Sequence, residues 1–74
     1  MTAIIKKVSD LPPLIREKRK KDGLTQAEAA SLCGVGVRFL SDLENGKETL
    51  QISKVLKVLE GLGLVVEVRE RKYE

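Results

Sequence analysis

The chain has 74 residues, of which 42% are hydrophobic and 34% charged, and its net charge is +3. This balance is typical of one small folded domain and is too apolar for a disordered chain. No apolar run approaches the roughly 20 residues that cross a bilayer, so we expect a cytoplasmic protein without a membrane partner. The single cysteine excludes an internal disulfide, and without histidine the usual zinc and haem ligand sets cannot form, so we expect no metal and no cofactor.

The chain opens with the β-prone piece AIIKKV, which we interpret as an arm or edge strand within residues 1–9. Asp10 is expected to N-cap a first helix, because the two prolines that follow it fit the first helical turn. Gly23 suits the left-handed position just past a helix end, so this helix should end near Asp22. Its apolar face would consist of Leu11, Leu14 and Ile15.

The segment TQAEAASLCGVGVRFLSDLENGK, residues 25–47, contains too much glycine for one helix, since each interior glycine costs about 1 kcal/mol relative to alanine. Thr25 and Glu28 have the spacing of a capping box, which predicts a helix from this pair to about residue 33. The glycines at 34–36 predict a tight turn with positive φ, and a third helix is expected over 37–45. The core between these helices would be closed by Ala30, Cys33, Val35, Leu40 and Leu43.

A fourth helix is expected to be capped by Thr49 and to end at Gly63. Its apolar face would be Ile52, Val55, Leu56, Leu59 and Leu62. Residues 64–70, LVVEVRE, alternate between apolar and polar side chains, which predicts a half-buried strand. A lone strand needs a neighbour, either AIIKKV or the same strand of a second subunit; we favour a homodimer whose interface contains Leu64, Val65, Val66 and Val68.

Two short helices joined at a glycine turn have the proportions of a helix-turn-helix unit. The stretch LTQAEAASLCGVGVRFLSDLENGK resembles the signature of the Cro and C1 repressor (XRE) class, and the resemblance extends over residues 11–62. The short chain and the strand LVVEV after the fourth helix make it similar to HipB-type antitoxins within that class. The resemblance implies a mainly α, lambda-repressor-like domain of four or five helices over 10–63, a dimerisation strand over 64–70 and a tail over 71–74.

In that group the dimer binds a palindromic operator in double-stranded DNA, represses its own operon and neutralises a HipA-type serine/threonine kinase toxin. The resemblance places the base-reading positions on Gly36, Val37, Arg38, Ser41 and Asp42. Arg38 is the best candidate for direct readout, because a guanidinium can donate two hydrogen bonds to guanine; the alternative is a phosphate contact only. Many relatives carry Ser, Thr or Gln at the positions of Gly36, Val37 and Phe39, so DNA shape is expected to contribute more here. Phe39 is expected to be partly buried.

Phosphate contacts are expected from Thr25, Gln26, Asn45 and Lys47, since the start of the second helix attracts an anion and the last two residues leave the third helix. Arg19 and Glu44 match a pair that joins the first and third helices in some relatives, and we expect it to be structural. The other charges of the basic run 16–21 either touch DNA or keep the chain soluble.

The sequence offers no basis for an enzyme, because it lacks histidine, a glycine-rich phosphate loop and paired carboxylates at a cleft. Two other functions stay open beside the antitoxin. One is a stand-alone regulator without a toxin, and the other is a toxin-binding module that binds DNA weakly.

Overall fold

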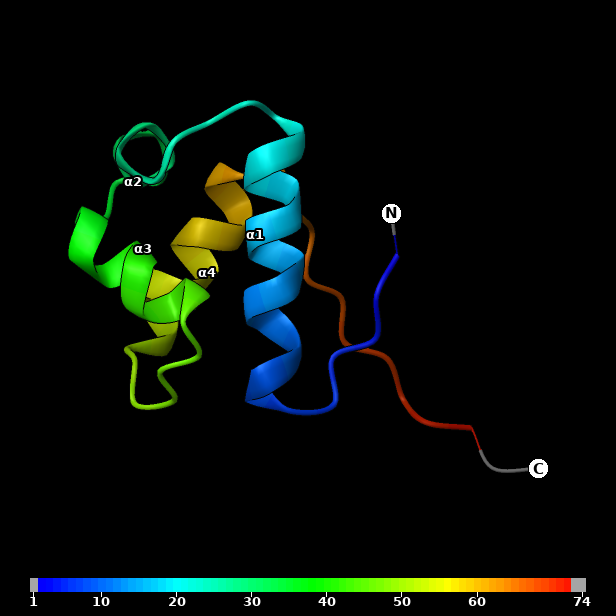
Figure 1. Ribbon diagram of the computed structural model, residues 1–74. Helices are drawn as coiled ribbons and strands as arrows, with labels where there is room; N and C mark the ends of the chain where they lie inside the picture. Colours follow the sequence, from blue (N-terminus) through cyan, green and yellow to red (C-terminus); the bar gives the residue numbers. More distant parts are fainter. Residues whose placement is uncertain (1, 73–74) are drawn as a thin grey trace.

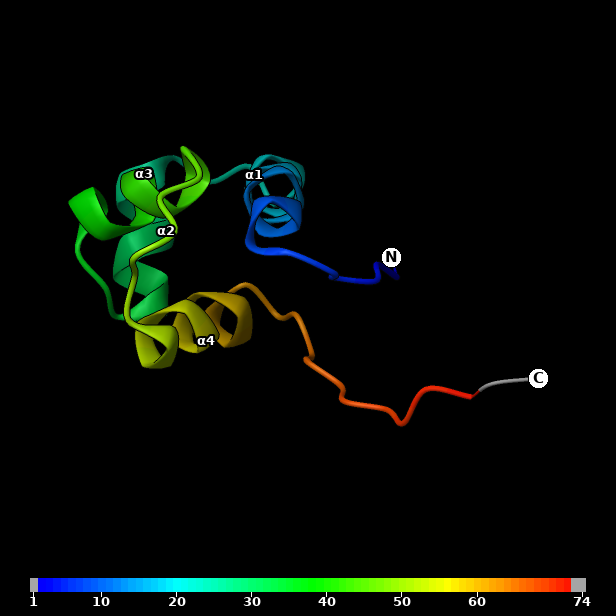
Figure 2. The same cartoon turned by 90° about the horizontal axis from the view of Figure 1, so that it is seen from below.

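The computed structural model describes residues 2–72, and these contain four α-helices and one turn of 3-10 helix. The elements are η1 (Val8–Asp10), α1 (Leu11–Lys21), α2 (Gln26–Cys33), α3 (Val37–Glu44) and α4 (Ile52–Gly61). Figure 1 and Figure 2 both place α2 and α3 on one side of the domain, while the N-terminal arm and residues 64–72 leave it on the other side. The predicted mainly α, four-helix architecture is confirmed.

The first three helices begin and end where the sequence predicts. Asp22 is the C-cap of α1 and is followed by Gly23 at φ +70. The capping box at the start of α2 is present, with the Glu28 N–H donating to Thr25 Oγ1 at 3.1 Å and the Thr25 N–H donating to Glu28 Oε1 at 2.9 Å. Gly46, at φ +87, follows the end of α3. These signals are local hydrogen bonds and backbone preferences, which do not depend on the rest of the fold.

The predicted N-terminal features are partly wrong. Asp10 precedes α1 but makes no capping hydrogen bond to it, because the residues that would donate, Pro12 and Pro13, have no N–H. The Asp10 carboxylate instead accepts the N–H groups of Lys6 (2.9 Å) and Lys7 (3.2 Å), and these bonds lower the pKa of Asp10. AIIKKV forms no edge strand within the described residues: it is an exposed arm that leads into η1.

A single core lies between the helices. It is formed by Ile15, Ala29, Ala30, Cys33, Leu40, Leu43, Val55, Val58, Leu59 and Leu62. α2 and α4 approach each other closely at Gly61, where an added Cβ would lie 2.6 Å from Cys33 Sγ and 2.8 Å from Cys33 Cα. The Cys33 thiol is buried and lies 3.5 Å from the Val58 carbonyl oxygen; burial raises its pKa. Cys33 is therefore part of the core.

Helix α4 differs from the prediction at its start and in its buried face. Thr49 does not cap it: the N-cap is Gln51, because Leu50 packs against the core and residues 48–51 remain a loop. The buried stripe contains Val58 in place of Ile52 and Leu56, which are 69% and 45% exposed. Both stripes share the spacing of a helix face, so the pattern alone could not decide between them.

The predicted strand over residues 64–70 is not formed within the described part of the chain. The Leu64 N–H donates to the Leu59 carbonyl at 2.9 Å and completes the end of α4, and the backbone beyond it is in neither helix nor strand. Val65 and Val68 are 91% and 94% exposed, and AIIKKV does not pair with this segment. A strand needs a partner for its backbone, so pairing with a second subunit remains a prediction.

Candidate nucleic-acid interface

The turn between α2 and α3 determines how α3 leaves the domain. Gly34 is the C-cap of α2 at φ +71, a left-handed backbone that strains residues with a Cβ. The Val35 N–H donates to the Ala30 carbonyl at 3.0 Å and closes the turn. Gly36, the N-cap of α3, has extended backbone (φ −71, ψ 150), so the positive φ expected in this turn occurs at Gly34 alone.

Helix α3 has a buried side and an outer face. Its buried residues are Leu40, Leu43 and Glu44, at 0%, 2% and 4% exposure. We call the opposite side the outer face; it consists of Arg38, Ser41, Asp42 and Asn45, which follow the i, i+3, i+4, i+7 spacing of one helix side. Arg38 and Asn45 are exposed, Ser41 and Asp42 are half-buried, and Val37 beside them is 50% exposed. The structure therefore brings three of the predicted base-reading residues to one accessible side, with Val37 on its flank and Gly36 at its N-terminal end.

Few internal contacts occupy the polar groups of the outer face. The Asn45 side-chain amide donates to Ser41 Oγ at 3.5 Å. Lys47 Nζ lies 3.7 Å from Asp42 Oδ2, so the one acid on this face has a partly exposed lysine beside it. The Arg38 side chain makes no hydrogen bond or ion pair with any other residue in the part of the chain that the structure describes. Its guanidinium donors are available to an external acceptor.

The start of α2 is less open than the sequence suggested. The Thr25 N–H is already bonded to the Glu28 carboxylate, and this bond is the main cause that lowers the pKa of Glu28. The negative charge of Glu28 repels an anion at this helix end. Because the Thr25 N–H is occupied, Thr25 can donate only its hydroxyl hydrogen to a phosphate. Gln26 donates its side-chain amide to Glu44 Oε1 at 3.3 Å and leaves one N–H and the amide oxygen for other partners.

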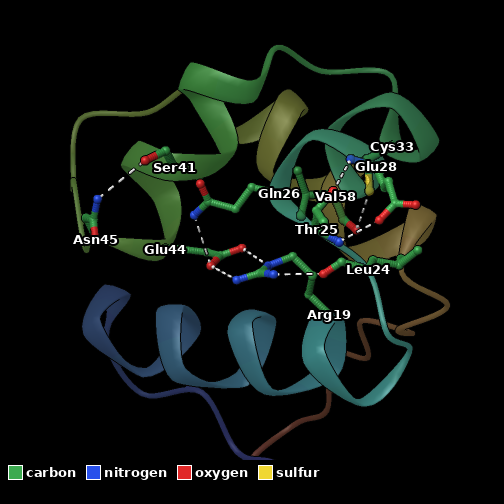
Figure 3. A network of polar contacts seen from close by, with 10 residues as sticks. All are labelled: Arg19, Leu24, Thr25, Gln26, Glu28, Cys33, Ser41, Glu44, Asn45 and Val58. Atoms are coloured by element: carbon green, nitrogen blue, oxygen red, sulfur yellow. Dashed lines mark hydrogen bonds and ion pairs between the residues drawn. The ribbon is translucent and has the colours of Figure 1, made fainter.

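A buried ion pair fixes α1 against α3 (Figure 3). Arg19 donates from Nε to Glu44 Oε2 at 2.7 Å and from Nη2 to Glu44 Oε1 at 2.9 Å, and from Nη1 to the Leu24 carbonyl at 2.8 Å. Burial by itself would raise the pKa of Glu44, but the hydrogen bonds from Arg19 and Gln26 outweigh it and the pKa is lowered. The predicted pair between Arg19 and Glu44 is present, and it joins α1, α3 and the loop before α2.

One cation beside α3, Lys54, was not among the residues predicted from the sequence. Phe39 is half-buried and packs against the core, as predicted. The ammonium of Lys54, in the first turn of α4, lies 5.8 Å from the centroid of the Phe39 ring. These residues are 15 positions apart, and no local pattern links them.

Three of the four predicted dimer residues, Leu64, Val65 and Val66, line an apolar groove beside α4. The groove is lined by Leu56, Leu59, Glu60, Leu64, Val65 and Val66. Leu64 is half-buried, whereas Val66 is 58% exposed and Val68, outside the groove, is almost fully exposed. Figure 2 shows that the chain after α4 runs away from the domain on the side opposite α3.

The family described as Helix-turn-helix (HTH_3) matches residues 15–65, which include all four α-helices except the first turn of α1. The chain belongs to this family. A relative from Sinorhizobium fredii, the uncharacterized HTH-type transcriptional regulator y4mF, is 47% identical over 68 residues, or 92% of this chain and 90% of the relative. The family and this relative identify the chain as a DNA-binding helix-turn-helix transcription regulator of the Cro/C1 (XRE) type.

Solved structures of HipB have the same fold. A HipB variant in a complex with an O2 20-mer is 25% identical, and the match covers 97% of this chain and all of that one at a TM-score of 0.85. HipB in the HipA-HipB-O2-O3 complex is 24% identical, with 96% of this chain covered, all of that one, and a TM-score of 0.84. The predicted resemblance to HipB is therefore confirmed.

Residues 2–72 offer neither a membrane-spanning helix nor a cluster of metal ligands. No helix there has the length and apolar character needed to cross a membrane. No group of three or more histidine, cysteine, aspartate or glutamate side chains is arranged there to hold a metal ion.

Proposed function

We propose that this protein is a homodimeric repressor that inserts α3 into the major groove of a palindromic operator, and that it is the antitoxin of a HipA-type kinase toxin in the cytoplasm. The observation that carries the DNA-binding part is the outer face of α3, which combines an accessible, unpaired Arg38 with a fully buried opposite side. A helix whose inner residues hold it rigidly to the core can present its outer residues in a fixed geometry.

Base reading is assigned to Gly36, Val37, Arg38, Ser41 and Asp42. Arg38 donates to guanine O6 and N7, and Asp42 accepts from the amino group of cytosine. The bare backbone at Gly36 and the exposed Val37 allow close approach to the DNA but supply no side-chain hydrogen bond. Part of the specificity is therefore assigned to DNA shape.

Phosphate binding is assigned to Thr25, Gln26, Asn45 and Lys47. Lys47 is the strongest of these, because its side chain is 52% exposed and carries a full positive charge. The weak ion pair with Asp42, at 3.7 Å, costs little to break when a phosphate approaches. Thr25 and Gln26 contribute through the hydroxyl hydrogen and the unused amide N–H.

Dimerisation is assigned to residues 64–70, with Leu64, Val65, Val66 and Val68 at the interface. Exposed valines in a segment with a strand pattern favour pairing with the same segment of a second copy. The dimer would present two copies of α3 to half-sites about 34 Å apart, one turn of the duplex.

The antitoxin role is supported by the likeness to HipB, which has been solved in complex with HipA. The alternative is a stand-alone regulator, which the name of the Sinorhizobium fredii relative equally allows. Purification of the native complex followed by mass spectrometry decides between them. A kinase that co-purifies in stoichiometric amount supports the antitoxin, and a dimer without a kinase supports the stand-alone regulator.

DNA binding is tested by fluorescence anisotropy with the duplex that lies upstream of the protein's own gene and with a scrambled duplex of equal length. Arg38→Ala is expected to cost more than about 1 kcal/mol on the upstream duplex and less on the scrambled one, because a bidentate base contact is lost. Lys47→Ala should weaken both duplexes about equally and lower the salt slope by about 1 per protomer. An upstream duplex that binds no better than the scrambled one, with wild-type protein at physiological salt, contradicts the proposed repressor.

A further inference from the structure

A lysine of α4 lies over an aromatic ring of α3. Lys54 is exposed, and its ammonium lies 5.8 Å from the centroid of the Phe39 ring. Within residues 2–72 it has no acidic partner, so its positive charge is not neutralised inside the protein. The ring face attracts a cation without neutralising its charge or using its N–H donors.

The position of Phe39 on α3 determines where this charge lies. Successive residues of an α-helix are turned by about 100°, so Phe39 occupies the flank between the buried side and the outer face. Asp42 lies at the edge of the outer face next to this flank, three residues further on, and has Lys47 beside it. Two lysines from different parts of the chain therefore border the same edge of α3.

We propose that Lys54 is a further phosphate-binding residue, and that Phe39 is a positioning residue that holds its ammonium along the edge of α3, toward the sugar-phosphate backbone. This inference rests on the proposed DNA binding by α3. In a complex of a helix-turn-helix protein with DNA, the phosphates of the two DNA strands border the major groove. The recognition helix, here α3, enters this groove, so a cation on the flank of α3 faces the phosphates.

The next lysine of α4 provides a matched control. Lys57 is also exposed, but it lines a shallow depression with Leu32, Glu60 and Gly61, at the last turns of α2 and α4. Lys54→Gln and Lys57→Gln change the net charge and the helix propensity equally. A difference in DNA affinity between the two variants therefore comes from where the lysine lies and not from the loss of one charge.

The experiment measures the affinity for a scrambled duplex by anisotropy between about 50 and 200 mM salt, a range over which phosphate contacts change affinity strongly. Lys54→Gln is expected to reduce the slope of log K against log salt by about 0.9 per bound protomer, which corresponds to about an 8-fold loss at 0.1 M. Lys57→Gln should leave the slope unchanged, and Lys54→Arg should retain it because arginine keeps both the charge and the ring contact.

The role of Phe39 is tested with Phe39→Leu, alone and combined with Lys54→Gln. A positioning residue lowers affinity in the wild-type background and has no further effect once Lys54 is neutral, whereas a purely structural residue lowers it equally in both. Thermal melts of all variants, followed by circular dichroism, confirm that each is folded at the assay temperature.

Equal slopes for Lys54→Gln and the wild type, or equal losses for Lys54→Gln and Lys57→Gln, overturn this inference and leave the proposed function in place. An equal effect of Phe39→Leu in both backgrounds overturns the positioning role. Absence of salt-dependent binding by the wild type overturns the proposed function, and this inference with it.

Discussion

Gly61→Ala is expected to destabilise the protein, although alanine is the better helix former. Gly61 is the last residue of α4, and an alanine Cβ there would lie 2.6 Å from Cys33 Sγ and 2.8 Å from Cys33 Cα. Ordinary contact begins at 3.4 Å, so the gap to the Cα is short by about 0.6 Å. Because that atom belongs to the backbone of α2, a change of rotamer cannot relieve the contact and the two helices must separate.

Two opposing contributions determine how much Gly61→Ala changes the free energy of unfolding. Replacing a helical glycine by alanine gains at most about 1 kcal/mol, and less at a helix end. Overpacking a tight core costs about 1 to 3 kcal/mol, and here the separation of α2 from α4 also loosens Val58 and Leu59. A net loss of about 1 to 2 kcal/mol is expected, out of the roughly 3 to 5 kcal/mol that a domain of this size can have.

Urea denaturation followed by circular dichroism measures this loss as a lower midpoint at unchanged slope. Gly36→Ser is the matched control: its Cβ meets open space and its φ of −71 is ordinary, so stability should stay equal or rise by up to about 1 kcal/mol. Cys33→Ala in the Gly61→Ala background removes the sulfur contact but not the backbone contact, and should restore part of the stability. A Gly61→Ala variant as stable as the wild type would refute the assigned close approach.

Three further predictions concern the ion pair and the tail. Glu44→Gln should cost about 3 kcal/mol in urea denaturation because it leaves the Arg19 charge buried without a counter-charge, whereas the double change to methionine at both positions should cost much less. Since folding lowers the pKa of Glu44, the ion pair stabilises the fold at pH values above the unfolded pKa near 4.5. This stability should be lost as the pH falls through the lower pKa of the folded state. A free energy of unfolding that stays constant between pH 5 and 2 would contradict this. Val66→Asp should abolish the dimer, and a stable dimer in light scattering would exclude residues 64–70 as its interface.

The sequence predicted those features whose cause is local. The ends of α1, α2 and α3 follow from Gly23, the capping box at Thr25, Gly34 and Gly46, and each of these acts through its own backbone or its immediate neighbours. The outer face of α3 follows from the same logic, because two buried leucines three residues apart determine which side remains accessible.

Features that depend on a distant partner could not be predicted. The choice of Val58 over Leu56 depends on where α2 lies, and the need for glycine at position 61 depends on Cys33, 28 residues earlier. Asp10 shows a local failure of another kind: a good capping residue precedes two prolines, which offer it no N–H to accept. The predicted strand over 64–70 is not formed within the described residues, because no neighbouring strand is present there to pair with its backbone.

The buried side of α3 stabilises the fold, and its outer side is the one that we propose binds DNA. Glu44 belongs to the buried side, yet its two oxygens hold Arg19 of α1 and Gln26 at the start of α2 at the same time. The angle of α3 to α1 and α2 is therefore fixed by directional, charge-assisted hydrogen bonds as well as by the non-directional packing of Leu40 and Leu43. Conservative changes to those leucines are absorbed by repacking, whereas a change at Glu44 removes the bonds that define the angle. Loss of this carboxylate should thus impair DNA binding even at temperatures where the domain remains folded.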